Sequence, residues 1–428
     1  MNALTLAKSG LLFIPLLILT CSVIRIRWGL RLPIAAAIAL VLALVLPALL
    51  ERGDLGYLVS FACMASIYAI LALGLNCQWG YTGHLNFGIA GMFAVGAFTT
   101  ALFTTSAPTG VMAQYTQQAF GLEAPFLVGI LAAAVVAGIV AFLIAVPVLR
   151  LRMDFLAIAT LGIAEIIRRI FQNERWLANG PQPLRGVPQP MHCAVEEPAC
   201  AWMPQWLAQF LAPLAQRDYN LVFLVIVALF LMATYLLLER ALRSPWGRVL
   251  RGARDEEEAT SMSGKNVPWI RIQSFVVGGI VMGIAGGLYA HYVITIDYSH
   301  FRPLFATFLV WVMLMLGGSG NNRGAVLGAF IIWGVWSGTA FLTAFLEPVL
   351  AAISSELPQR SAYLRWLFVA LLLAGIVLFR PQGILREETI VSRHLLDRAP
   401  ARGRRRLRAR GEGTESAHES ERAEPRTP

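Results

Sequence analysis

Long apolar runs, separated by short polar connections, are the feature that most constrains how this chain can fold. Of its 428 residues, 57% are hydrophobic and only 14% are charged, whereas a soluble domain carries about 25% charged residues. Several runs reach the roughly 17–25 residues that a helix needs to cross the hydrocarbon core of a bilayer. Backbone groups in lipid must form hydrogen bonds within their own segment, so such runs are helical. The sequence therefore predicts an all-α, polytopic transmembrane helical bundle.

We expect about nine to eleven membrane segments. The run at 304–316 is too short to cross alone and is interpreted as a half-helix or a re-entrant segment. The run at 11–24 resembles a signal-peptide core, but Arg25, Arg27 and Arg31 follow it without a small-residue cleavage site, which favours a retained span. The runs lie at residues 11–24, 32–50, 56–75, 85–103, 125–149, 155–171, 221–238, 272–294, 304–316, 325–342 and 364–379.

The net charge of +10 is explained by membrane topology rather than by nucleic-acid binding. Lys and Arg concentrate in short connections and at the C-terminus, and an excess of these residues marks cytoplasmic loops. The connection 239–271 is rich in Arg, whereas the loop 104–124 contains neither Lys nor Arg. Alternating sides through the segments puts the basic pieces in the cytoplasm, with the N-terminus outside and the C-terminus inside. We expect membrane lipid, and no nucleic acid, among the partners.

This topology divides the chain into a membrane domain at 1–379 and a tail at 380–428. The connection 172–220 falls outside and is rich in Pro and Trp, while 239–271 falls inside. The tail has no apolar periodicity and ends in a segment rich in Glu, Ser and Pro, which is typical of disorder. Its Arg cluster is interpreted as an attachment to anionic lipid, worth about 1 kcal/mol per basic residue.

Motifs for covalent chemistry are absent from the sequence. No GxxxxGK[ST] phosphate-binding loop occurs, and the fragment at 263–266 lacks the first glycine and the hydroxyl residue. No His/Cys cluster has the spacing of a metal site. We therefore expect no catalytic residue, no metal and no bound cofactor on this chain. If ATP drives the protein, a separate polypeptide hydrolyses it.

The connection 239–271 contains a pattern that is typical of docking to an ATPase. Glu258 and Ala259, followed by Gly264, fit the EAA-x3-G loop of the membrane subunits of ABC importers. A short helix broken by a glycine forms a rigid knob that can enter a groove on a soluble partner. Arg248 precedes the pattern and is included among the coupling residues. The alternative is an ordinary charged cytoplasmic loop.

Further segments resemble the branched-chain amino-acid ABC permeases of the LivM type. The segment GLNCQWGYTGHLNFGIAGMFAVGAF at 74–98 is similar to the signature of that family, and RLRMDFLAIATLGIAEIIRRI at 150–170 is similar to its next block. Three more blocks follow in order: FVVGGIVMGIAGGLYAHYVITI, LGGSGNNRGAVLGAF and LFRPQG.

The resemblance implies a transport subunit without enzymatic chemistry, located in the bacterial inner membrane. It implies a homologous second permease subunit, cytoplasmic ABC ATPases that bind ATP, and a periplasmic substrate-binding protein. The substrate would be leucine, isoleucine, valine or a related amino acid.

Polar residues interrupt the apolar sequence just after the run at 56–75. Gly80 and Gly83 flank a polar stretch, which is the composition of a broken helix whose unwound backbone can face a substrate or a cavity. The alternative is a turn with capping side chains. The candidate pathway residues of this stretch are Tyr81, Thr82, His84 and Asn86.

Glu165 is a charged residue within an apolar run. Arg168 and Arg169 follow at i+3 and i+4, so all three side chains share one face of the predicted helix and can pair. Charges inside spans usually face a partner or a water-filled cavity. Glu165 is therefore a second candidate for the substrate pathway, while the two arginines alternatively mark the outer edge of the membrane.

Small-residue stripes predict close helix packing, a use that small-xxx-small spacing serves in membrane proteins. Gly279, Gly283 and Gly287 form such a stripe, and Gly88, Gly91 and Gly96 are also interpreted as packing residues that allow close helix approach.

Cys193 and Cys200 lie close together in the connection that the charge rule places outside. That compartment is oxidising in bacteria, so a disulfide between them is expected. The alternatives are two free thiols, or a metal held together with His192.

Three other functions remain open from the sequence. An ion-coupled secondary transporter of small solutes would explain Glu165 and His84 but would leave the EAA-like pattern unexplained. A non-transporting membrane scaffold would have no need for polar, glycine-broken spans. Within the permease family, urea or short amides are alternative substrates.

Overall fold

The computed structural model describes residues 52–108, 116–190, 205–353, 363–380 and 382–387 of the chain. Two predicted spans, at 11–24 and 32–50, lie outside the described residues. So do the pair Cys193 and Cys200 and the Arg-rich tail beyond residue 387.

Every predicted apolar run within the described residues has a helical counterpart, and this confirms the all-α fold. No β-strand element occurs among these residues, where pairing is limited to isolated bridges. Four stretches of the described chain are long and apolar enough to cross a membrane: Leu55–Gly80, Phe126–Val148, Tyr219–Arg243 and Val267–Val293. The main helices of the bundle are α3 (Arg52–Leu75), α4 (Ile89–Thr104), α5 (Phe126–Val148), α6 (Met153–Asn173), α8 (Gln205–Arg243), α11 (Val267–Val293), α12 (Leu309–Gly317), α13 (Asn322–Ile353) and α15 (Leu364–Phe379).

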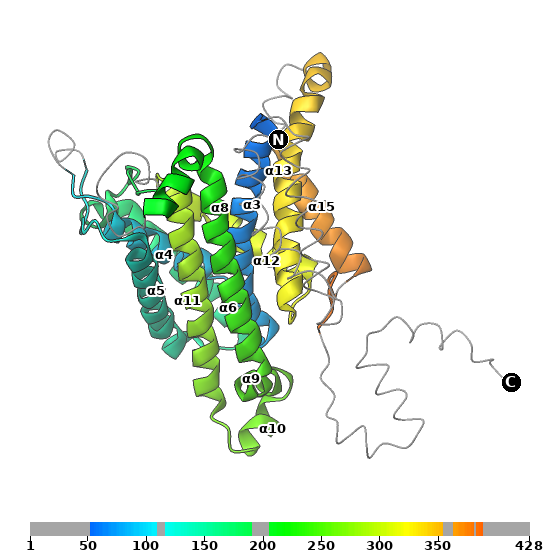
Figure 1. Ribbon diagram of the computed structural model, residues 1–428. Helices are drawn as coiled ribbons and strands as arrows, with labels where there is room; N and C mark the ends of the chain where they lie inside the picture. Colours follow the sequence, from blue (N-terminus) through cyan, green and yellow to red (C-terminus); the bar gives the residue numbers. More distant parts are fainter. Residues whose placement is uncertain (1–51, 109–115, 191–204, 354–362, 381, 388–428) are drawn as a thin grey trace.

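Helix α11 lies at the centre of the bundle and packs closely against α4 and α5 (Figure 1). Its glycines make the approach possible because they present backbone instead of side chains. A Cβ atom at Gly279 would lie 2.5 Å from Ala141 Cβ on α5, and one at Gly287 would lie 2.5 Å from Thr100 Oγ1 on α4. Gly96 on α4 meets the backbone of Gly283, so neither position has room for a side chain.

Two other glycines bring α6 against the start of α4. A Cβ atom at Gly91 would lie 3.0 Å from Ala164 Cα, and one at Gly88 would lie 3.2 Å from the Thr160 carbonyl oxygen. Helix α6 thus covers the junction at which α4 begins.

The outer face of α5 carries an apolar stripe. Residues Leu127, Leu131, Val135, Ile139 and Leu143 recur at helical spacing, and each is more than half exposed. A soluble surface would not carry such a continuous patch, but lipid would cover it.

The two ends of the bundle differ. One end carries the short helices α9 (Pro245–Asp255) and α10 (Glu257–Met262), below the C-terminal end of α8 (Figure 1). At the other end the connection after α7 (Arg175–Ala178) pairs with the connection after α11, through the bridge between Leu184 and Ile296.

The short run predicted at 304–316 forms a half-helix. It begins with a π-helical turn, η6 (Leu304–Phe308), and continues as α12. At 1.5 Å per residue the two together span about 21 Å, which is less than the roughly 30 Å hydrocarbon core. The short helix η5 (Tyr298–Phe301) precedes this half-helix.

Candidate functional site

The helix that begins with α3 is interrupted where the sequence becomes polar. After α3 the chain makes a π-helical turn, η1 (Asn76–Gly80), and has no helical structure again until α4 begins at Ile89. Gly83 has a φ of +75°, a conformation that favours glycine. Tyr81, Thr82, His84 and Asn86 are all buried in this segment. The predicted helix break is confirmed, while the role of these residues in a pathway remains a prediction.

Side chains within the break replace the missing helical hydrogen bonds. Asn86 Nδ2 donates to Gln78 Oε1 at 2.6 Å, and Asn86 Oδ1 accepts from the Gly88 amide at 2.6 Å. Gln78 Nε2 in turn donates to the carbonyl oxygen of Phe275 on α11 at 2.8 Å. Asn86 and Gln78 therefore tie the unwound segment to the central helix.

Neighbouring helices bind further backbone groups in the unwound segment and at the start of α4. Thr160 Oγ1 on α6 accepts from the Phe87 amide at 3.0 Å, and Trp311 Nε1 on α12 donates to the Asn86 carbonyl at 3.0 Å. Thr307 Oγ1 on η6 accepts from the Ala90 amide at 3.2 Å. Unwound backbone at membrane depth requires this kind of support.

Thr82 and His84 have different environments. The Thr82 hydroxyl lies 2.8 Å from the Ser274 hydroxyl on α11. Both ring nitrogens of His84 are buried and have no hydrogen-bond partner within the described part of the chain. A buried polar group without a partner costs about 1–3 kcal/mol. Of these residues, His84 would gain most from a water or solute molecule that reached the break.

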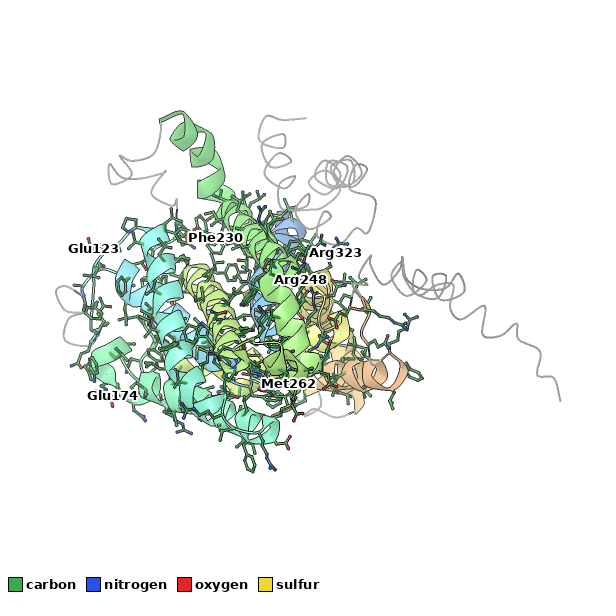
Figure 2. All side chains as sticks on the ribbon, turned by 90° about the horizontal axis from the view of Figure 1, so that it is seen from below. Glu123, Glu174, Phe230, Arg248, Met262 and Arg323 are labelled. Atoms are coloured by element: carbon green, nitrogen blue, oxygen red, sulfur yellow. The ribbon has the colours of Figure 1, made fainter. Side chains whose placement is uncertain are left out.

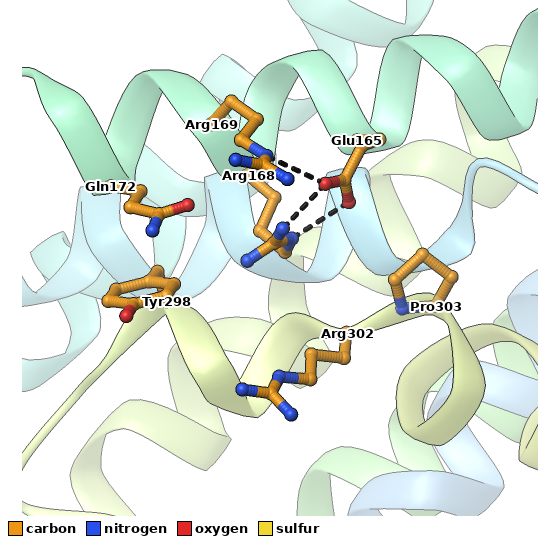
Figure 3. A pocket seen from close by; sticks show the side chains of 7 residues that line it. All are labelled: Glu165, Arg168, Arg169, Gln172, Tyr298, Arg302 and Pro303. Atoms are coloured by element: carbon orange, nitrogen blue, oxygen red, sulfur yellow. Dashed lines mark hydrogen bonds and ion pairs between the residues drawn. The ribbon is translucent and has the colours of Figure 1, made fainter.

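Glu165 on α6 forms the ion pairs that its spacing predicts. Its carboxylate accepts from Arg168 at 2.8 and 2.5 Å and from Arg169 at 2.9 Å. The three residues border an open pocket of about 370 Å³, whose other wall includes Tyr298 and Arg302 (Figure 3). The excess of arginine over glutamate gives this pocket a positive character.

Glu165 and the helix break belong to separate places in the structure. The residues Tyr81, Thr82, His84 and Asn86 do not line the pocket that Glu165 borders. The two candidates are linked only indirectly, because α6 carries Glu165 and also supports the break through Thr160.

The predicted coupling residues lie on the exposed surface of α9, α10 and the following turn. Ser244 caps α9 by accepting from the Trp246 amide, and Pro245 occupies the first helical turn. Gly264, with a φ of +78°, turns the chain between α10 and α11. Figure 2 looks onto this end of the bundle, where Arg248 and Met262 mark α9 and α10. The side chains of Arg248, Glu258 and Ala259 are exposed to solvent.

Arg254 joins this surface to the helix break, a role that the sequence did not reveal. Its guanidinium donates to the Gly80 carbonyl oxygen and forms ion pairs with Glu387 at 3.0 Å and Asp255 at 2.9 Å. Burial alone would lower the pKa of Arg254, but the hydrogen bonds and charges of Glu387 and Asp255 raise it above its ordinary value. Arg254 is therefore a permanent positive charge between α9, the break and the C-terminal segment.

An asparagine pair extends this connection to α8 and α13. Asn76 Nδ2 donates to Asn322 Oδ1 at 2.9 Å, and Asn76 Oδ1 accepts from the Gly320 amide at 2.9 Å. Asn322 Nδ2 then donates to Glu239 Oε2 at 2.9 Å. The break is thus linked to α13 directly and to α8 through Asn322.

A bundle of apolar helices with an interrupted span and an exposed polar loop at one end is typical of a polytopic membrane transport protein. The sequence profile of the family described as "Branched-chain amino acid transport system / permease component" matches residues 57–379. The chain belongs to this family.

Curated relatives agree with this assignment. The chain is 31% identical over 349 residues to the "High-affinity branched-chain amino acid transport system permease protein LivM" of Escherichia coli (strain K12), with 81% of this chain and 73% of the relative covered. The protein of the same name from Salmonella typhimurium (strain LT2) has the same identity and coverage. The "Probable branched-chain amino acid transport permease protein LivM" of Methanocaldococcus jannaschii is 27% identical over 350 residues, which cover 76% of this chain and 92% of that protein. No solved structure matches the chain.

Proposed function

We propose that this chain is the membrane-spanning subunit of an ATP-binding-cassette importer in the bacterial inner membrane. It forms part of the pathway for branched-chain or related amino acids. ATP binds to separate cytoplasmic ATPases, and the chain itself holds no cofactor. A homologous permease subunit and a periplasmic binding protein complete the assembly, with the C-terminus and α9–α10 in the cytoplasm.

The link from α9 to the helix break is the observation that carries this proposal. An importer must convert the movement of an ATPase into a change in its spans, which requires a surface for docking and a connection inward. The exposed helices α9 and α10 supply the surface, and Arg254 supplies the connection through Gly80. A break in a span suits a conformational change of the spans, because fewer helical backbone hydrogen bonds oppose movement there.

Uptake in reconstituted liposomes tests the proposal. The chain is expected to move L-leucine only when its permease partner, the ATPases, the binding protein and ATP are all present. Transport by the purified chain alone, driven by a proton or sodium gradient, would instead establish an ion-coupled transporter. Urea or a short amide taken up in preference to leucine would contradict the proposed substrate class.

Gly264→Pro tests the docking turn within the same assay. Proline fixes φ near −65°, whereas Gly264 has a φ of +78°. The variant is expected to remain in the membrane and to lose most ATP-dependent uptake, while ATP hydrolysis continues. The control is Gly162→Ala on α6, because open space surrounds that glycine. Proline is not used at Gly162, since it would break the helix.

A further inference from the structure

A second cavity, of about 420 Å³, lies between α3, α11, α13 and the connection that leads into η6. Its volume falls in the range of sites for single small molecules, roughly 300–1,000 Å³. Five aromatic side chains form much of its wall: Tyr68, Tyr289, Phe305, Trp333 and Trp336. The polar residues of the lining are Ser299, His300 and Arg302.

The aromatic wall is held in place by contacts between its own rings. Tyr68 stacks on Trp333, with ring centroids 4.7 Å apart and an interplanar angle of 20°. Trp336 meets Phe305 edge to face at 5.6 Å. Rigid aromatic surfaces of this kind accept apolar groups with little loss of conformational freedom. The wall therefore suits an aliphatic side chain of a solute.

Arg302 supplies the charge of the cavity. It lies where this cavity adjoins the Glu165 pocket, since it lines both (Figure 3). Among the residues that the structure describes, Arg302 forms no ion pair and its side chain forms no hydrogen bond. His300, beside it, has a buried Nδ1 atom without a hydrogen-bond partner in the same part of the chain. Arg302 is exposed at the mouth shared by the two pockets, and its planar guanidinium fits a carboxylate through two parallel hydrogen bonds.

We propose that this cavity binds one α-amino acid with an apolar side chain. Arg302 donates to the carboxylate, and the side chain of the solute packs against Tyr68, Trp333 and Trp336. The inference rests on the proposed function, because it gives the permease its own recognition site in addition to that of the binding protein. It adds Arg302 and the aromatic wall to the residues that determine specificity.

Equilibrium binding of radiolabelled L-leucine to the purified full-length chain in lipid nanodiscs tests this site without the binding protein. The wild type is expected to bind, and Arg302→Gln is expected to bind at least about tenfold more weakly, because a charged hydrogen-bonding partner is lost. Arg185→Gln, an exposed arginine outside both pockets, is the matched control and should bind like the wild type.

Competing ligands separate the two parts of the proposal. 4-Methylpentanoate keeps the carboxylate and the aliphatic chain, while L-leucinamide lacks the carboxylate. The first is expected to displace labelled leucine at lower concentration than the second. The reverse order would show that the aromatic rings hold the ammonium group instead, and it would overturn the assignment of Arg302.

Tryptophan fluorescence provides a measurement that does not depend on the Arg302 variant being folded. Leucine should change the emission of the wild type, and the change should shrink in the variant with both Trp333→Phe and Trp336→Phe. An unchanged response in that variant would place leucine elsewhere.

The assembled importer distinguishes failure of this site from failure of the proposed function. If ATP-driven leucine uptake is normal but the isolated chain binds no leucine, lipid or another segment fills the cavity and only this inference is wrong. If the assembled importer moves no amino acid, the proposed function itself is wrong.

Discussion

Asn86 holds the non-helical segment between α3 and α4 together through its own side chain. Its side-chain nitrogen donates to Gln78 Oε1, and its side-chain oxygen accepts from the Gly88 amide. Both hydrogen bonds are buried. Asn86→Ala leaves these two groups without partners, at about 1–3 kcal/mol each. We expect the variant to reach the membrane and assemble but to show several-fold lower uptake. Transport assays with quantified complex would measure this, and Asn173→Ala, at an exposed position at the end of α6, is the control.

Glu165 is the negative charge of an otherwise positive pocket. Glu165→Gln keeps the shape of the side chain but removes the charge that pairs with Arg168 and Arg169. We expect uptake to fall while assembly persists, because two arginines would then be left uncompensated in this pocket. Asp154→Asn, at an exposed acid in the first turn of the same helix, should have little effect. Equal uptake by both variants would leave Glu165 with a packing role only.

Sequence reasoning found Glu165 and missed Arg254 for a simple physical reason. The pairing of Glu165 is local, so the i+3 and i+4 spacing of a helix predicts it. Arg254 bonds to Gly80, and Asn76 bonds to Asn322, across 174 and 246 residues of chain. No helix or strand periodicity in the sequence predicts contacts over such separations. The segment LGGSGNN did indicate that contacts exist, because three polar residues beside glycines in an apolar region require hydrogen-bond partners.

We propose that coupling depends on helices α9 and α10 and on the contact of Arg254 with Glu387. Arg254→Ala removes the bond to Gly80 and the ion pair to Glu387 together. We expect this variant to hydrolyse ATP in the assembled importer while uptake falls by about tenfold, as if about 1.4 kcal/mol of coupling were lost. Arg254→Lys should restore only part of the uptake, since lysine cannot serve three partners in the same plane.

A double-mutant cycle identifies the partner that matters. Glu387→Gln should reduce coupling in the wild type but have no further effect in Arg254→Ala. Arg240→Ala, at an exposed position on α8, is the control for loss of a basic residue at this end. If Arg254→Ala transports as well as that control, the link to the break is structural only.

The helices themselves were predictable to the extent that hydropathy defines them. The run predicted at 364–379 matches α15 residue for residue, whereas the run at 221–238 underestimates α8, which continues to Arg243. Helix α8 extends beyond its apolar core because charged residues such as Glu239 and Arg243 pair at i+4. Helix α4 begins at Ile89 rather than at residue 85, because side-chain hydrogen bonds hold the preceding backbone unwound.

At the scale of the whole molecule, the orientation in the membrane can be tested through Cys193 and Cys200. These residues lie outside the described part of the chain, so their disulfide remains a prediction from sequence. In intact cells a membrane-impermeant thiol reagent should label the pair only after mild reduction, because the charge pattern of the sequence predicts that the loop faces an oxidising compartment. Cys63 and Cys77 are buried and should stay unlabelled in both conditions. Labelling before reduction would exclude the disulfide, and no labelling after reduction would contradict the topology.

The segment after α15 is fastened to the bundle, and this has a practical consequence. The amides of Ile384 and Leu385 donate to the carbonyl oxygens of Leu316 and Gly317, and Asn321 holds the carbonyl of Arg386. Position 386 is thereby held against the loop between α12 and α13. A spin label there and a second one at Met262, which is 86% exposed on α10, would measure the distance between α10 and the C-terminal segment. Changes in the distance between the two labels would follow the importer through its nucleotide cycle in real time.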